Sequence, residues 1–146
     1  MEISRLALGL AMTTAISLPA VAGDLAKVGI SVGSLGNPFF VATIKGIEDK
    51  AKSLNPSVQV TSVSSDYDLN KQFTQVDNFI AAGTNVLMIN AVDPKAIEPA
   101  VKKAQAAGMI VAAFDVAAAG ADVTVMTDNV KAGTLACQYI VDHLPN

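Results

Sequence analysis

Short apolar runs alternate with longer segments of helical periodicity from residue 27 onward, and this alternation limits the possible folds more than any other feature. The runs at 85–90 and 109–114 are apolar almost throughout, which is typical of strands buried on both faces of a sheet. Strands that alternate with helices form a parallel sheet with helices on its faces. We therefore predict an α/β fold, a doubly wound, flavodoxin-like parallel sheet, with strands over 27–32, 58–63, 85–90, 109–114 and 123–126 and helices over 38–54, 69–82, 93–107 and 130–143.

The first predicted helix indicates which side chains face the core. Asn37 suits the cap of a helix, and Pro38 suits the first helical position, where its missing N–H has no acceptor to lose. Phe39 falls outside the apolar stripe, so its ring is free to lean into a cleft. Helical spacing predicts a buried stripe of Phe40, Ile44, Ile47, Ala51 and Leu54 on this helix and of Leu69, Phe73, Val76 and Ile80 on the second.

Residues 1–22 have the layout of a secretory signal peptide. Arg5 precedes an apolar stretch over 6–16, Pro19 breaks the segment after it, and Ala20, Val21 and Ala22 supply the small residues of a cleavage site. The alternative is an uncleaved membrane anchor, but the apolar stretch is shorter than the ~20 residues that a spanning helix requires. We expect export to the periplasm with cleavage near Ala22.

Charge and cysteine content exclude several classes of protein. The net charge is −3 and no basic run exceeds Lys102–Lys103, so the chain lacks the basic face that a nucleic-acid partner requires. The single cysteine, Cys137, permits neither an intramolecular disulfide nor a cysteine-based zinc site. We expect Cys137 to be a buried or half-buried small residue of the last helix.

The motifs of common enzymes and cofactor sites do not fit. Residues 29–33 spell G-x-S-x-G, but Ser31 lies inside a predicted strand rather than on a sharp turn, and the only histidine is His143. The glycines at 29, 33 and 36 match neither a dinucleotide-binding loop nor a Walker A loop. We predict no catalytic residue, no cofactor and no metal site, with a small α/β enzyme as the alternative.

Polar residues gather where the predicted strands end. In parallel sheets, ligands bind outside the carboxyl ends of the strands. Asn37, Phe39 and Asp115 lie there and suit a sugar, because an aromatic face covers C–H groups while amides and carboxylates bind hydroxyls. A second interpretation stays open, in which both Phe39 and Phe40 belong to the core and Asp115 forms a turn.

The chain from about residue 27 to 139 resembles the N-terminal lobe of the ribose/galactose-type periplasmic binding proteins, which serve ABC importers. The resemblance rests on 28–32, Asn37-Pro38-Phe39-Phe40, 75–80, 87–90 with Asp93, Phe114-Asp115, and 127–129 with Gly133. It implies no enzymatic activity and a ligand site of Asn37, Phe39, Phe40, Asn90, Asp93 and Asp115. The family often has an arginine after that last aspartate. Here Val116 stands instead, which favours a polyol, a deoxygenated sugar or another small solute over a ribose-like ligand.

The resemblance also implies a domain organisation. Residues 23–129 would form one ligand-binding lobe, Thr127, Asp128 and Asn129 would be the first hinge crossing, and 130–146 would begin a truncated second lobe. The implied partners are a small sugar or polyol and, through the complete protein, an ABC permease, with the protein a monomer. A chemoreceptor-linked binding protein and a lactose-repressor-type effector domain share this pattern, although the leader occupies the place of the repressor's DNA-binding segment.

Overall fold

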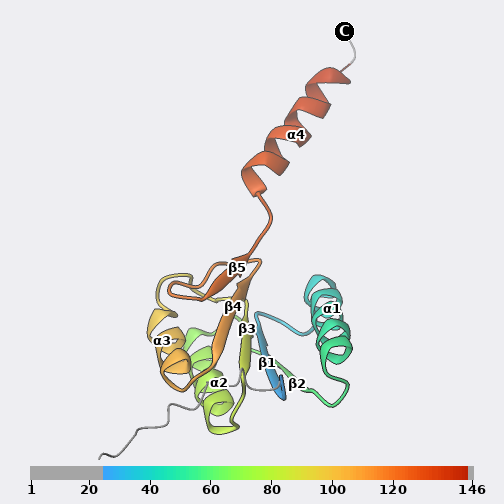
Figure 1. Ribbon diagram of the computed structural model, residues 1–146. Coiled ribbons are helices and arrows are strands. Elements are labelled where there is room, and N and C mark those ends of the chain that lie inside the picture. The colour runs from blue at the N-terminus through green and yellow to red at the C-terminus, as the bar shows by residue number, and fades with distance from the viewer. Residues whose placement is uncertain (1–24, 145–146) are drawn as a thin grey trace, which may run out of the picture.

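The computed structural model describes residues 25–144, which form a parallel five-stranded sheet, its helices, and a separate C-terminal helix (Figure 1). The predicted leader, residues 1–22, lies outside the described residues. The strand order is β2-β1-β3-β4-β5, the flavodoxin-like order, and every neighbouring pair is parallel. This confirms the predicted fold class. The elements are β1 (Lys27–Val32), α1 (Pro38–Leu54), β2 (Gln59–Ser64), α2 (Leu69–Ala81), β3 (Val86–Ile89), α3 (Glu98–Ala106), β4 (Ile110–Phe114), β5 (Val123–Val125) and α4 (Asn129–Asp142).

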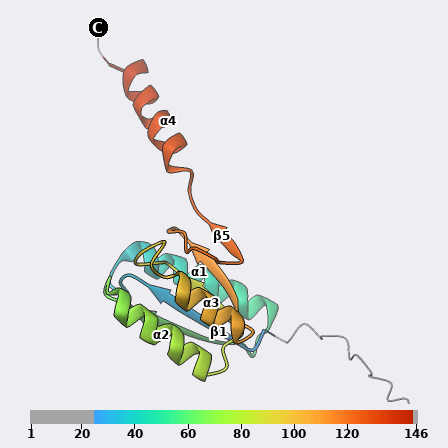
Figure 2. The same cartoon turned by 90° about the vertical axis from the view of Figure 1, so that its left-hand side faces the viewer.

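The sheet lies between α1 on one face and α2 with α3 on the other, as Figure 2 shows from the side of α2 and α3. One apolar cluster joins α1 to β1 and includes Phe40 and Ile30, while the other joins α2 and α3 to β3 and β4. Gly29 of β1 faces α2, where an added Cβ would approach the ring of Phe79 to 2.7 Å. Every member of both clusters lies between Leu25 and Ala121, so this lobe carries a hydrophobic core of its own.

Two predicted helical features differ from the structure. The helix expected over 93–107 begins only at Glu98, with Pro99 in its first turn. Had the helix begun at Pro94, Pro99 would sit in its interior, where the missing N–H and the ring would break it. Leu54, predicted to be buried, is 64% exposed because it ends α1 at the edge of an apolar groove that no other described helix covers.

The buried face of α2 is centred on Gln72, Gln75, Val76 and Phe79, whereas three residues of the predicted stripe, Leu69, Phe73 and Ile80, lie partly buried at its margin. The four buried positions, 72, 75, 76 and 79, follow the i, i+3, i+4 and i+7 spacing that is typical of the core side of a helix. Two of the four, Gln72 and Gln75, are polar although they are buried.

Helix α4 extends away from the lobe (Figures 1 and 2), and all of its residues are exposed. Cys137 is therefore exposed, and the expectation that it would be buried is wrong. The cause is the position of the helix rather than its sequence, because Leu135 and Ile140 are also more than half exposed. Within residues 25–144, none of the helices combines the length and the hydropathy that a membrane-spanning segment needs.

Candidate functional site

A cavity of about 430 Å³ opens at the carboxyl ends of β1, β3 and β4. It lies where the strand order reverses, between β1 and β3, which is the position at which open α/β sheets bind ligands. Its volume falls within the range of small-molecule sites. Five of the six predicted ligand residues line it, together with one aromatic residue from the β2–α2 loop: the full lining is Asn37, Phe39, Phe40, Tyr67, Asn90, Ala91, Val92, Asp115 and Val116.

The start of α1 places an amide and two aromatic rings at this cavity. The side-chain oxygen of Asn37 accepts a hydrogen bond from the N–H of Phe39 at 2.9 Å, so the cap uses the oxygen and leaves the amide NH₂ for a ligand. Phe40 is 5% exposed and belongs to the core, whereas Phe39 is 52% exposed. The two rings meet edge to face at 5.3 Å. Only Phe40 is therefore a core residue, and Phe39 presents its ring to the cavity mouth.

Asp115 follows β4 in a conformation that is rare outside glycine. Its φ is 61°, and such left-handed residues persist where surrounding contacts hold them, often at ligand sites. One carboxylate oxygen accepts a hydrogen bond from Nδ2 of Asn90 at 3.0 Å, and the backbone N–H donates to the carbonyl of Val125 at 2.9 Å. Asn90 is itself buried, at 4% exposure, and its N–H donates to the carbonyl of Ser31. Asn90, which follows β3, thus holds the carboxylate of Asp115, and β5 holds its backbone.

A buried polar network connects Asn90 to α2. Nε2 of Gln72 donates to the carbonyl of Asn90 at 2.9 Å and to Oγ of Ser31 at 3.1 Å, while its Oε1 accepts from the N–H of Val92 at 2.9 Å. Oγ of Ser31 donates to Oε1 of Gln75, which in turn bonds the end of β2. Sequence reasoning missed these residues. The available signal was the presence of two glutamines at the core spacing of α2.

Asp93 and the predicted hinge residues lie away from the cavity lining. The carboxylate of Asp93 accepts hydrogen bonds from the N–H groups of Ala96 and Lys95, each at 2.8 Å, and these bonds hold the pKa of Asp93 below its usual value. It therefore shapes the turn before α3. Thr127 and Asp128 lie between β5 and α4, and Asn129 is the first residue of α4. The carboxylate of Asp128 caps α4 by accepting a hydrogen bond from the N–H of Lys131.

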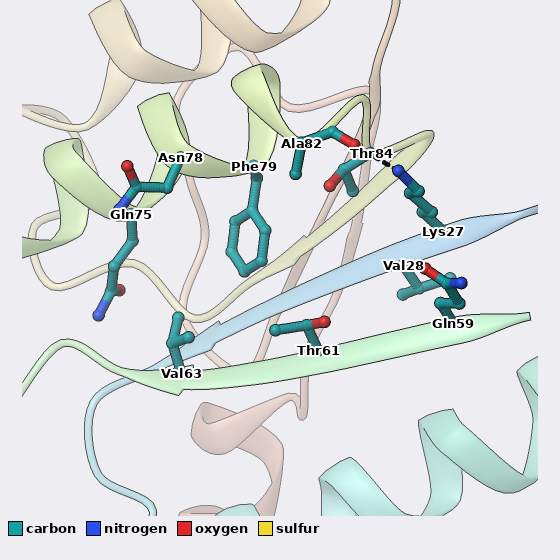
Figure 3. Close-up of a pocket in the computed structure, with 10 residues that line it drawn as sticks. All are labelled: Lys27, Val28, Gln59, Thr61, Val63, Gln75, Asn78, Phe79, Ala82 and Thr84. Atoms are coloured by element: carbon teal, nitrogen blue, oxygen red, sulfur yellow. Dashed lines mark hydrogen bonds between the residues drawn. The ribbon is translucent and has the colours of Figure 1, made fainter.

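A second hollow, of about 280 Å³, lies between α2 and the strands β1 and β2 (Figure 3). The ring of Phe79 stands between the helix and the strands, and Nζ of Lys27 donates to the carbonyl of Ala82 at the end of α2. Its lining contains no carboxylate, and Lys27, Gln75 and Phe79 already make contacts that hold α2 to the sheet. Within residues 25–144 no cluster of histidine, cysteine or acidic side chains forms a metal site.

The sequence matches a known family and known proteins. The family described as the periplasmic binding protein domain matches residues 28–146. The ribose import binding protein of Bacillus subtilis is 40% identical over 119 residues, which are 80% of this chain and 38% of that protein. The chain therefore spans less than half the length of this relative.

Solved structures agree with the sequence matches. The myo-inositol-bound Caulobacter myo-inositol binding protein has a TM-score of 0.70 at 28% identity, covering 84% of this chain and 42% of that one. An ABC transporter solute-binding protein from Mycobacterium smegmatis with bound glycerol has a TM-score of 0.73 at 33% identity, covering 82% and 41%. In each case the described lobe corresponds to a part of a longer chain.

Proposed function

Because this chain belongs to the periplasmic binding protein family, we propose that its cavity is one wall of a carbohydrate or polyol site in a solute-binding protein of an ABC importer. The observation that carries the proposal is the combination of a fixed carboxylate, Asp115, with the free amide of Asn37 and the exposed ring of Phe39 around one cavity. The family is one of binding proteins rather than enzymes.

Each of these groups suits one part of a polyhydroxylated ligand. The carboxylate of Asp115 accepts hydrogen bonds from neighbouring hydroxyls, and bonds to an ionised acceptor are stronger than neutral ones. The amide of Asn37 donates to a hydroxyl or ring oxygen. The ring of Phe39 covers the C–H surface of the ligand, while Phe40 supports that ring from the core.

The apolar side chain of Val116 restricts which polyhydroxylated ligands suit the cavity. It lines the cavity directly after Asp115 and offers only methyl groups. A ligand hydroxyl or ring oxygen that lies against Val116 would lose the water that hydrates it. It would find no hydrogen-bond donor on the protein in return, so the affinity would fall. A polyol or a sugar without an oxygen at that point fits better. The names of similar proteins support the general class of polyhydroxylated ligands, because they include ribose, myo-inositol and glycerol.

The remainder of the proposal concerns the complete protein. Residues 1–22 would direct export to the periplasm with cleavage near Ala22, and 23–129 would form the first lobe. Thr127, Asp128 and Asn129 would act as a hinge, and 130–146 would begin a second lobe that covers the apolar side of α4. Hinge closure over the ligand would produce the form that docks, as a monomer, on the permease.

The test uses the protein freed of its first 22 residues, because the lobe has its own core. Binding of ribose, myo-inositol, glucose and glycerol is followed by NMR titration, which detects weak complexes. We expect a dissociation constant of about 1 mM or weaker from one wall of the site, and loss of the response in Asp115→Ala. Asp49→Ala, which removes an exposed carboxylate on α1, is the matched control. Absence of a response to every carbohydrate, or unchanged affinity in Asp115→Ala, would overturn the proposal.

A further inference from the structure

Tyr67 is an exposed aromatic residue at the cavity to which the sequence assigned no role. It lies in the loop between β2 and α2, lines the cavity, and is 61% exposed, so its ring does not serve the core. Its hydroxyl makes no hydrogen bond within the described part of the chain. Among the side chains that line the cavity it supplies the only hydroxyl group.

The backbone at Tyr67 is strained. Asp66 and Tyr67 have φ values of 53° and 58°, and two consecutive left-handed residues other than glycine are costly. The loop is held in this conformation at several points. The carboxylate of Asp66 accepts hydrogen bonds from Nζ of Lys71 and from Oγ of Ser64, and these bonds hold the pKa of Asp66 below its usual value. The carboxylate of Asp68 caps α2.

Gly33, at the end of β1, makes room for the ring. A Cβ placed on Gly33 would lie 2.3 Å from Cε1 of Tyr67, and its two next-nearest neighbours are also ring atoms of Tyr67. The φ of Gly33 is not in the left-handed region, so the backbone itself does not require glycine here. The missing side chain is needed for the ring to lie against the end of β1.

A strained loop and a glycine thus fix an exposed ring beside Asp115 and Phe39, an arrangement that costs stability and buries little apolar surface. We propose that Tyr67 contacts the bound carbohydrate or polyol, forming the wall of the site on the β2 side and setting ligand selectivity through its ring face and its hydroxyl. This inference rests on the proposed function of the cavity. The hydroxyl of Tyr67 can form a hydrogen bond with the ligand, whereas the side chain of Val116, which also lines the cavity, cannot.

The composition of the chain provides a direct test. There is no tryptophan, and the two tyrosines are Tyr67 and Tyr139, so Tyr139→Phe leaves Tyr67 as the only strong emitter. Titration of this variant with myo-inositol or ribose is expected to change tyrosine fluorescence saturably, with the same midpoint as the NMR titration. Tyr67→Ala is expected to bind about five-fold more weakly, the effect of losing one ring contact. Tyr67→Phe is expected to change the order of preference among ligands.

Controls separate a ligand contact from a structural role. Tyr139→Ala removes a tyrosine of similar exposure, 65%, and is expected to leave affinity unchanged. Tyr67→Gly keeps the left-handed backbone without strain, so it is expected to raise the urea midpoint while weakening binding. If Tyr67→Ala binds like the wild type while Asp115→Ala does not bind, Tyr67 has no ligand role and the proposed function stands. If Asp115→Ala also binds like the wild type, both proposals fail.

Discussion

Replacing Gln72 by methionine tests whether the buried polar network positions the cavity. Gln72 is fully buried, and methionine has nearly its length and volume, so the change removes hydrogen bonds without opening a large void. The carbonyl of Asn90 and the N–H of Val92 each lose their partner, and Ser31 keeps its bond to Gln75.

The expected cost follows from these two backbone groups. A buried polar group without a partner costs about 1–3 kcal/mol. The carbonyl of Asn90 is buried, whereas the N–H of Val92 is only partly buried and regains some bonding to water. We therefore expect a loss of about 2–4 kcal/mol, a large share of the 5–15 kcal/mol that is typical of a domain. Because Asn90 and Val92 line the cavity, ligand affinity should fall as well.

Urea unfolding followed by circular dichroism measures the change, with NMR titration for affinity. Gln138→Met makes the same replacement at an exposed helical position of α4 and should stay within about 0.5 kcal/mol of the wild type. The melting temperature of Gln72→Met should fall by at least about 8 °C. A loss no larger than that of Gln138→Met would refute the view that the network holds the site.

Two further predictions follow from the cavity and the sheet. Phe40→Ala should cost about 3–5 kcal/mol of stability. Phe39→Ala should change stability by less than about 0.5 kcal/mol and weaken carbohydrate binding, so equal destabilisation by the two changes would contradict their separate roles. The carboxylate of Asp122 accepts hydrogen bonds from the N–H of Val111 and from Gln105, and these bonds lower its pKa in the folded state. Its stabilising effect is therefore present above the unfolded-state pKa of about 4 and is lost as the pH falls through the lower folded-state pKa. Asp122→Asn should reduce the fall of the urea midpoint below pH 4, and an unchanged pH profile would argue against this role.

The fold and most of the cavity were predictable because they depend on local patterns. Alternating strands and helices determine a parallel sheet, and the sheet places the ends of its strands together, which brings Asn37, Asn90 and Asp115 to one cavity. Phe39 and Phe40 were separated correctly by helical spacing, although the pattern alone left open whether both were core residues.

The remaining features depend on contacts between distant segments. The ring of Tyr67 lies against Gly33, and Gln72 bonds to Asn90, and neither pair shares a local motif. Asp93 was assigned to the ligand by resemblance, whereas its carboxylate bonds the two N–H groups that follow it. The burial expected for Cys137 depended on a neighbouring element that α4 does not meet within the described residues.

The hydrogen bond from Asp115 to Val125 gives the site a mechanical connection to the rest of the chain. The same residue presents its carboxylate to the cavity and fixes the last residue of β5, three positions before the cap of α4. A rotation of the segment after β5 that moves Val125 would therefore also move the backbone of the residue proposed to hold the ligand. Occupancy of the cavity and the direction in which the chain leaves the lobe should then vary together, so that a spin label on α4 would report binding at a distance.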